Sequence, residues 1–423
     1  MSSLSLPVLL GGEPIRTAPF ESFPRTFGNE LDEVRAVLDG DNWLSGPATR
    51  RFEENLAAYL GVRNVIAVNT GGMALQIAMR CLGLEPGDEV LVQVDTCVAD
   101  AFAIFNAGAA PIFADSNPET FMLDWDSVEA SIGPRTKAII PVHMWGRPEN
   151  MDMVAEVAAR HNLLVIDDAC LACGAEWRGK KAGTLGQAGV FSFGCLKPFQ
   201  AGGGGAIVTD DDSLAREMRV SRSWGETTDE FGIRDQRELA WNGRMSDVMA
   251  AVLIAQLKGY PAHLRTLQEN ALRLERMIEG LPGIRPMDRD ERITAQAHTQ
   301  FTFKLDEPEL GITLNTFAEA LQAEGIPMVW HGAFEPMTTL SFFRGGRWRR
   351  WAVGHPDHDW LAVNYGRPYP GAERGFYHVG VSIGRNVLCS GPQAVEDTGR
   401  IIGRICANTD RLAEWEGQQV AGH

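Results

Sequence analysis

The sequence has 423 residues, 44% of them hydrophobic, and is long enough to bury one large core and a second, smaller one. Its 55 acidic and 39 basic residues give a formal net charge of -16, which repels nucleic-acid backbones and anionic lipid. We therefore expect small-molecule ligands, with no role on nucleic acid or at a membrane surface.

The beginning of the chain predicts neither a secretion signal nor a membrane span. The apolar stretch from Leu4 to Leu10 follows no basic region and is too short to cross a bilayer. Seven cysteines scattered over the chain do not form the dense framework of a small secreted domain, so we expect a cytoplasmic protein. Cys170 and Cys173 have CxxC spacing, but no second such pair exists, so no metal site is predicted.

Residues 60 to 210 alternate short apolar runs with helical stretches, which is typical of βαβ units and a mostly parallel sheet. Runs such as V-L-V-Q-V and L-L-V-I are almost continuously apolar, as in strands covered on both faces. Apolar residues three and four apart predict crossover helices at 72–82 and 151–161. The expected strands are 64–68, 89–94, 110–113, 137–142, 163–166, 189–193 and 206–209.

A long leucine-rich pattern beyond residue 245, interrupted at Pro261, predicts one or two helices that leave the first domain. A strand at 300–305, a helix at 313–324 and a final helix near 394–409 fit a smaller α/β domain. The stretch 338–374 has no clear period and predicts a long surface or active-site loop. We expect a large domain of residues 1–260, with an N-terminal arm, and a small domain of residues 261–423.

Two acidic residues, Asp167 and Asp168, end the apolar run V-I-D-D. Ligands in open α/β sheets bind outside the carboxyl ends of strands, so both are candidates for a functional site, with a helix N-cap as the structural alternative. Lys197 lies in F-S-F-G-C-L-K-P-F-Q-A-G-G-G-G-A-I-V-T, residues 191–209. Taken alone it would more often be an exposed loop lysine, but a position between two apolar runs and before four glycines is not typical of a solvated surface.

Together these segments resemble the DegT/DnrJ/EryC1/StrS family of sugar aminotransferases. The resemblance extends over nearly the whole chain and includes L-G-G-E-P-I-R at 10–16, T-K-A-I-I-P-V-H-M-W-G at 136–146, W-R-G-K-K-A-G at 177–183 and R-M-S-D at 244–247. It implies the α/β fold of aspartate aminotransferase (PLP fold type I), with a mostly parallel central sheet and a smaller C-terminal α/β domain.

The resemblance also implies the cofactor and the residues that activate it. Pyridoxal 5'-phosphate would be held as a Schiff base on Lys197, whose amine can also carry a proton to and from the substrate. Asp168 would stabilise the positive charge on the ring nitrogen, with Asp167 as a less direct neighbour. The implied reaction transfers an amino group from glutamine or glutamate to a keto-sugar or keto-cyclitol in secondary metabolism.

The phosphate needs donors at a helix N-terminus, which the turn N-T-G-G-M-A-L, including Gly71, Gly72 and Met73, can supply. By resemblance, Ser192 also contacts the phosphate. Asn242, in N-G-R-M, would reach the phosphate of a partner subunit, which implies a homodimer with shared active sites. From the residues alone, Asn242 could instead cap the helix that follows.

Three positions depart from the family's usual pattern. Gly72 replaces a threonine of the phosphate turn, Cys97 replaces an aromatic residue that stacks on the ring, and Leu171 replaces a glutamine near the ring hydroxyl. The loss would weaken cofactor affinity by a few kcal/mol, at about 1 kcal/mol per hydrogen bond and about 0.5–1.5 kcal/mol for the stack. Two alternatives follow: elimination or other carbanion chemistry on the same cofactor, or a non-catalytic partner of an active paralogue. The retained Lys197 and Asp168 favour a working enzyme.

Other polar and aromatic residues are candidates for substrate contacts. The resemblance places Trp330 and His331, in V-W-H-G-A-F-E, where the family often contacts its substrate. His143, at the end of an expected strand, either lines the pocket or is a structural histidine. The arginines of residues 344–350, interleaved with Trp348, either recognise an anionic group or form a solvated loop.

Overall fold

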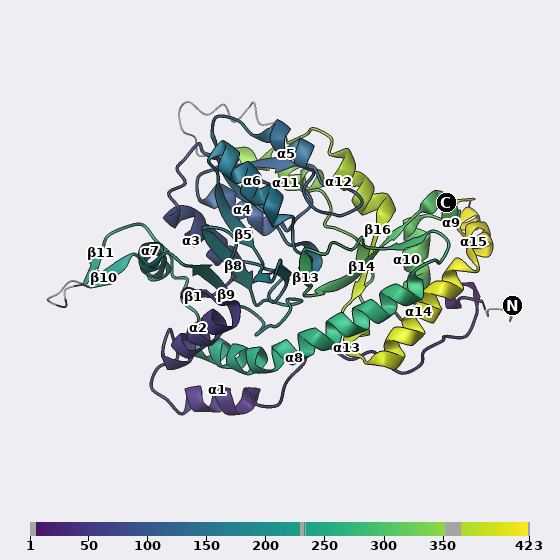
Figure 1. Cartoon of the computed structure of the whole chain (residues 1–423), viewed down its shortest axis with the longest axis horizontal. Helices are drawn as coiled ribbons and strands as arrows, with labels where there is room; N and C mark the ends of the chain where they lie inside the picture. The colour runs from purple at the N-terminus through teal and green to yellow at the C-terminus, as the bar shows by residue number, and fades with distance from the viewer. Residues whose placement is uncertain (1–5, 229–231, 233, 352–364, 422–423) are drawn as a thin grey trace.

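The structure is a computed structural model that describes residues 6–228, 232, 234–351 and 365–421. A seven-stranded sheet lies at its centre (Figure 1). Its order is β1 (Asn64–Val68), β9 (Gly205–Thr209), β8 (Ala188–Ser192), β5 (Leu164–Asp168), β4 (Thr136–Ile140), β2 (Glu89–Gln93) and β3 (Ala110–Ala114). Only β9, within the described chain, runs antiparallel to its neighbours in this sheet. The mostly parallel sheet is confirmed, and each expected strand has its counterpart.

Helices cover the central sheet and bury its apolar side chains. Thr70 begins α3 (Gly71–Cys81) by accepting a hydrogen bond from the Met73 N–H at 3.0 Å, and Asn162, at a φ of 53°, ends α6 (Met151–His161). Both predicted crossover helices are therefore confirmed. The other elements around this sheet are α1 (Glu30–Leu38), α2 (Pro47–Leu60), α4 (Val98–Asn106), α5 (Trp125–Ser131), α7 (Asp212–Arg222) and the hairpin β10 (Glu226–Thr228) and β11 (Arg234–Gln236).

A single helix, α8 (Asp247–Ile278), runs along the base of the molecule and continues into its smaller part (Figure 1). Of the one or two helices expected here, the structure has one, because the helix continues through Pro261. Leu257, Tyr260 and Leu264 are buried in the same core on both sides of the proline. Their burial offsets the backbone hydrogen bond that proline cannot donate.

A second, antiparallel sheet has the order β12 (Ile284–Pro286), β14 (Gln300–Leu305), β16 (Gly380–Gly384) and β15 (Trp330–His331). The strand predicted at 300–305 is confirmed, and the helix at 313–324 corresponds to α10 (Leu314–Ala323). The expected final helix is two helices, α14 (Pro392–Cys406) and α15 (Thr409–Ala421). Shorter helices are α9 (Glu307–Leu310) and α13 (Asn386–Cys389).

Composition suggested a long loop at 338–374, of which residues 352–364 lie outside the described chain. In its described parts, this stretch is not such a loop. It contains α11 (Ser341–Arg344), α12 (Pro370–Arg374) and a 3-10 turn at 347–350. Phe343, Trp348 and Tyr365 are buried against Phe105 and Phe113 of the large sheet and its helices. Burial of aromatic area therefore orders this segment.

The arginines of residues 344–350 point into solvent rather than into a site. All four are exposed, and the Arg349 guanidinium lies 4.9 Å from the centre of the Trp348 ring. This arrangement fits the solvated, ring-stacked alternative.

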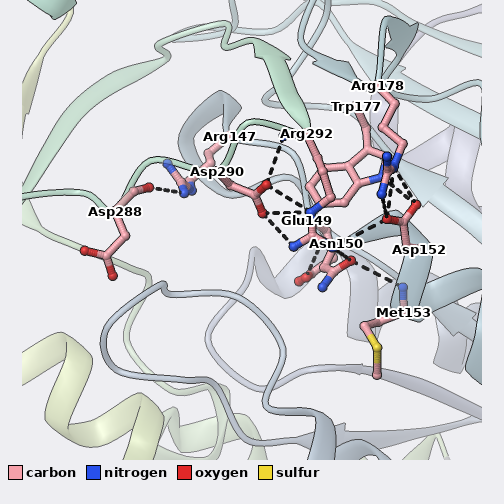
Figure 2. A network of polar contacts seen from close by, with 10 residues as sticks. All are labelled: Arg147, Glu149, Asn150, Asp152, Met153, Trp177, Arg178, Asp288, Asp290 and Arg292. Atoms are coloured by element: carbon pink, nitrogen blue, oxygen red, sulfur yellow. Dashed lines mark hydrogen bonds and ion pairs between the residues drawn. The ribbon is translucent and has the colours of Figure 1, made fainter.

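A third small sheet ties the two parts of the molecule together. In it, β13 (Ile293–Ala295) pairs with β6 (Glu176–Trp177), which pairs with β7 (Lys180–Lys181). Figure 2 shows the polar network beside it, where Arg292 donates to Asp290 at 2.7 Å and to Asp152 at 3.4 Å. Asp152, in the first turn of α6, also accepts from Arg178 at 2.9 Å. The segment before β13 is thus fixed to the large sheet's helices.

No helix in the part of the chain that the structure describes is long and apolar enough to cross a membrane.

Candidate active site

The N-terminus of α3 lies against the end of β8, which brings the predicted phosphate turn to Ser192. A Cβ added at Gly71 would stand 2.7 Å from the Ser192 Cβ and 3.3 Å from the Cys170 sulfur, so this close approach requires glycine. At Gly72, by contrast, no described atom lies within 4 Å of an added Cβ. The first N–H groups of a helix have no acceptor within it. The Met73 N–H donates to the Thr70 hydroxyl, so the N–H groups of Gly71 and Gly72 are the ones that this end of α3 can offer to a ligand.

Asp168 lies at the carboxyl end of β5 and is 4% exposed. Its Oδ1 accepts a hydrogen bond from the main-chain N–H of Cys170 at 2.8 Å, which fixes the orientation of the carboxylate. Cys170 therefore connects Asp168 to the phosphate turn, because its side chain also approaches Gly71. The structure thus brings Gly71, Ser192 and Asp168 together, as predicted from residues far apart in the sequence.

Asp100, in the first turn of α4, is a second carboxyl group beside Asp168 and is fully buried. Thr96 donates to its Oδ2 at 3.1 Å, whereas Oδ1 has no hydrogen-bond donor in the described part of the chain. Burial raises the pKa of Asp100 well above its ordinary value, and the charge of Asp168 raises it further against the opposing charge of Lys197.

Lys197 lies in the segment between β8 and β9 and is half-buried. Burial raises the pKa of the Cys97 thiol and of the Cys170 thiol, while the Lys197 charge acts to lower both, so the amine lies near both sulfurs. The preceding residue, Leu196, has a φ of 69°, and its carbonyl accepts a hydrogen bond from the Arg385 guanidinium. A residue of the second sheet's region therefore holds the backbone next to the lysine.

Cys97 is the N-cap residue of α4, beside Asp100, and is not a stacking group. Leu171 is buried and packs with Met122, Met144 and Trp145, forming an apolar wall where a polar contact was expected from the family pattern. Neither residue offers the contact that it replaces.

Trp330 and His331 form the edge strand β15 and lie in different surroundings. The Trp330 ring is stacked 6.2 Å from that of Trp145, which belongs to the apolar wall beside Leu171. The His331 Nδ1 lies 2.6 Å from the Phe376 carbonyl, and the two rings stack at 4.0 Å. Trp330 is therefore joined to the wall of the site, whereas one nitrogen of His331 is already engaged.

His143 is buried completely and is a structural histidine. Its Nδ1 accepts from the Glu149 main-chain N–H at 2.9 Å, and its Nε2 lies 2.6 Å from Asp167 Oδ1. The first contact places the ring proton on Nε2, which donates to the Asp167 carboxylate. Asp167 also accepts from the main-chain N–H groups of Gly183 and Leu185, so its role is to hold loops in place.

Asn242 is exposed, and its Oδ1 accepts from the Arg244 Nε at 3.2 Å. Its carbonyl accepts from the Asn69 side chain at 3.2 Å, so the residue lies next to the strand-to-helix turn of its own chain. Trp224 and Leu239, at the base of the hairpin that projects from the large sheet (Figure 1), are 50% and 82% exposed. Asn242 thus lies on a surface that carries exposed apolar side chains.

Two residues of the site were not found from the sequence. Trp145 has a φ of 51°, donates from its indole N–H to the Gly332 carbonyl at 2.6 Å and stacks on Phe334 at 4.9 Å. A non-glycine residue held at positive φ beside a candidate site is a common sign of function. The signal for Asp100 was an acid within the apolar run V-A-D-A-F-A-I-F.

The residues present fit a phosphate-bearing aromatic cofactor. Gly71 and Gly72 leave the N-terminus of α3 open for a phosphate, beside the Ser192 hydroxyl. A carboxyl group, Asp168, and an amine, Lys197, both act electrostatically on the Cys170 thiol at the carboxyl edge of the sheet. This donor set can hold a phosphate, a positively charged ring nitrogen and an aldehyde at three separate points.

Comparison with known proteins gives consistent results. The family model of the "DegT/DnrJ/EryC1/StrS aminotransferase family" matches residues 25–347. The chain is similar to "L-glutamine:2-deoxy-scyllo-inosose aminotransferase" of Streptoalloteichus tenebrarius, with 33% identity over 360 residues that cover 81% of this chain and 84% of the relative. It is also similar to "GDP-perosamine synthase" of Caulobacter vibrioides, with 44% identity over 246 residues that cover 57% of this chain and 65% of the relative. The solved structure of 3-amino-5-hydroxybenzoic acid synthase superposes with a TM-score of 0.80 and 28% identity, covering 93% of this chain and 100% of that one.

Proposed function

Because the chain belongs to the DegT/DnrJ/EryC1/StrS aminotransferase family and is an aminotransferase of PLP fold type I, we propose that it binds pyridoxal 5'-phosphate through Lys197. We further propose that it transfers an amino group from glutamine or glutamate to a keto-sugar or keto-cyclitol in secondary metabolism. The observation that carries the proposal is that Cys170 lies between Asp168 and the α3 N-terminus, and that the charge of Lys197 also acts on its thiol. The activities for which these relatives are named supply the substrate class.

Each group of the site has a defined task in this reaction. When bound, pyridoxal phosphate supplies an electron sink for the negative charge left on the carbon that loses a proton. The Lys197 amine moves that proton, and the Asp168 carboxylate, oriented by the Cys170 N–H, holds a positive ring nitrogen in place. Gly71, Gly72, Met73 and Ser192 bind the phosphate at the N-terminus of α3.

The face of the ring and the substrate side are lined differently from the family pattern. By the family pattern, Cys97 and Leu171 would flank the ring with apolar or weakly polar contacts; Leu171 itself is part of the wall that contains Trp145. Trp330, stacked on Trp145, is placed to contact the substrate, with His331 beside it on β15.

The proposal is tested by the absorbance of the full-length protein with pyridoxal phosphate, followed by titration with glutamine. A Schiff-base band that glutamine removes, with release of a keto acid, is expected for the wild type and for Lys180→Ala, a matched variant of an exposed lysine. Lys197→Ala should show no such band. A wild-type protein that cannot be reconstituted, or a band that survives Lys197→Ala, would refute the proposal. A band unaffected by glutamine and glutamate would leave the cofactor but refute transamination.

We also propose a homodimer in which Asn242 of each protomer reaches the phosphate of its partner. The exposed side chains of Asn242, Trp224 and Leu239 support this arrangement. Mixing Lys197→Ala with Asn242→Ala protomers tests it, because a mixed dimer contains one site with both native residues. Activity that reappears on mixing is expected; a monomer in solution, or no recovery in verified mixed dimers, would contradict it.

The domain division of 1–260 and 261–423 and the cytoplasmic location belong to the same proposal. The first range contains the seven-stranded sheet and the second the four-stranded sheet, while α8 spans the boundary. The location rests on the dispersed cysteines of the sequence.

A further inference from the structure

Two buried carboxyl groups lie side by side at the bottom of the site, one on α4 and one on β5. Asp100 is 0% exposed and Asp168 is 4% exposed. Burial, and then the charge of Asp168 and a side-chain hydrogen bond to it, raise the pKa of Asp100, so the two carboxyl groups lie close to each other. Two ionised carboxylates in contact and away from water repel each other and lose their hydration, which favours one proton held by the pair.

The hydrogen bonds around the pair indicate which group carries that proton. Asp168 Oδ1 accepts from the Cys170 N–H at 2.8 Å, so one of its oxygens is occupied by a main-chain donor. Asp100 accepts one hydrogen bond, from the Thr96 hydroxyl at 3.1 Å, and its Oδ1 has no donor among the described residues. A buried oxygen without a donor is costly for a carboxylate but is satisfied in a carboxylic acid, whose O–H donates.

The charged and titratable groups that face Asp100 do not reverse this assignment. They are Asp168, the Lys197 amine and the thiols of Cys97 and Cys170. The pKa of each thiol is raised, first by burial, so both remain neutral. The single cation therefore balances the single negative charge of Asp168.

We propose that Asp100 keeps its proton near neutral pH and donates it in a hydrogen bond to Asp168, and that it is thereby a positioning residue for the carboxylate that faces the cofactor's ring nitrogen. This inference rests on the proposed function, because the ring nitrogen belongs to the proposed cofactor. The Cys170 N–H and the Asp100 O–H together fix the rotation of Asp168. The ring nitrogen then faces one negative charge rather than two. The hydrogen bond from the Asp100 O–H also limits how strongly Asp168 attracts the proton on the ring nitrogen.

The first test counts the proton without the cofactor. Full-length apoprotein with 13C-labelled aspartate is examined by infrared spectroscopy at pH 8, where Asp95, the other buried aspartate of this region with a raised pKa of about 6, is ionised. We expect a label-sensitive C=O band of a protonated carboxyl group that disappears in Asp100→Asn and persists in Asp211→Asn, an exposed helix cap. If Asp100→Asn does not fold, Asp100→Ser replaces it. A wild type without the band, or a folded variant that keeps it, overturns the proposal.

The second test reads the effect on the cofactor by its absorbance during a pH titration. Asp100→Asn keeps an N–H donor for Asp168 and should titrate like the wild type. Asp100→Ala removes the hydrogen-bond donor to Asp168. The midpoint of the cofactor's absorbance titration should then move to higher pH by about one unit, which is about a tenfold change in the proton dissociation constant. Equal titrations for Asp100→Ala and the wild type would overturn the positioning role.

The two tests separate this inference from the proposed function. A wild-type protein that shows the carboxyl band but takes up no pyridoxal phosphate refutes the proposed function and, with it, the role of Asp100 toward the ring nitrogen. A protein that forms the Schiff-base band but lacks the protonated carboxyl group refutes only the assignment of the proton to Asp100.

Discussion

The buried imidazole of His298 should make the protein lose stability as the pH falls below neutrality. His298 is 9% exposed, and burial, followed by the positive charge of Arg147, lowers its pKa from 6.5 to about 4. Because the folded-state pKa is the lower one, the unfolded chain binds the proton first. The stabilising contribution is therefore present above pH 6.5 and is lost as the pH falls toward 4.

The size of the effect follows from the two pKa values. One pKa unit corresponds to about 1.4 kcal/mol, so a shift of about 2.5 units gives about 3 kcal/mol in full, of which about 2 kcal/mol is lost between pH 7 and pH 5. The His298→Asn variant removes this titration and tolerates the left-handed backbone of the site, where φ is 46°.

The assay is urea unfolding followed by tryptophan fluorescence, at pH 7 and pH 5 and at one protein concentration. Wild type should lose about 2 kcal/mol more than His298→Asn over this interval. His378→Asn, in which the replaced side chain is exposed, is the matched control and should lose as much as the wild type. If His298→Asn and the wild type lose the same amount, the attribution to His298 is refuted.

Three further substitutions test other parts of the structure. Asp167→Asn leaves one of three buried N–H donors without an acceptor, so it should lower the free energy of unfolding in urea by about 3 kcal/mol. Asp152→Asn, in which the replaced side chain is exposed, should lower the same free energy by less than about 1 kcal/mol. Gly71→Ala should weaken pyridoxal phosphate binding at least about tenfold in an absorbance titration, because its methyl group would lie 2.7 Å from the serine Cβ at the end of β8. Gly417→Ala, in α15, meets no described atom within 4 Å and should bind the cofactor as the wild type does; equal affinities for the two variants would contradict this reasoning. Trp145→Ala removes a wall of the site, so steady-state kinetics should show a KM for the amino acceptor that is raised about tenfold, with a smaller change in kcat. An unchanged KM would show that this wall lies away from the substrate.

Much of the fold could be predicted from local patterns. The strand at 300–305 and the helix at 151–161 have the predicted bounds, because alternating or helical apolar spacing directly reflects which side of an element avoids water. At Pro261 the pattern left one helix or two open, because local propensity takes no account of the core on both sides of the proline. The segment 338–374 was misread for the same reason, since its aromatic residues are ordered by packing against a distant sheet.

In the candidate site, too, some features could be predicted from the sequence and others depended on the tertiary structure. The sequence alone indicated Asp168 at a strand end and glycines at a helix start, because these depend on residue type and local geometry, whereas the role of Lys197, between two strands, followed from the family resemblance. Only the tertiary structure decided which groups meet. It placed Asp100 against Asp168 and bound both nitrogens of His143, so an acid in an apolar helix became part of the site and a histidine at a strand end did not. Burial and hydrogen-bond partners come from elements distant in the chain, and they set the protonation of a side chain, which residue identity by itself does not.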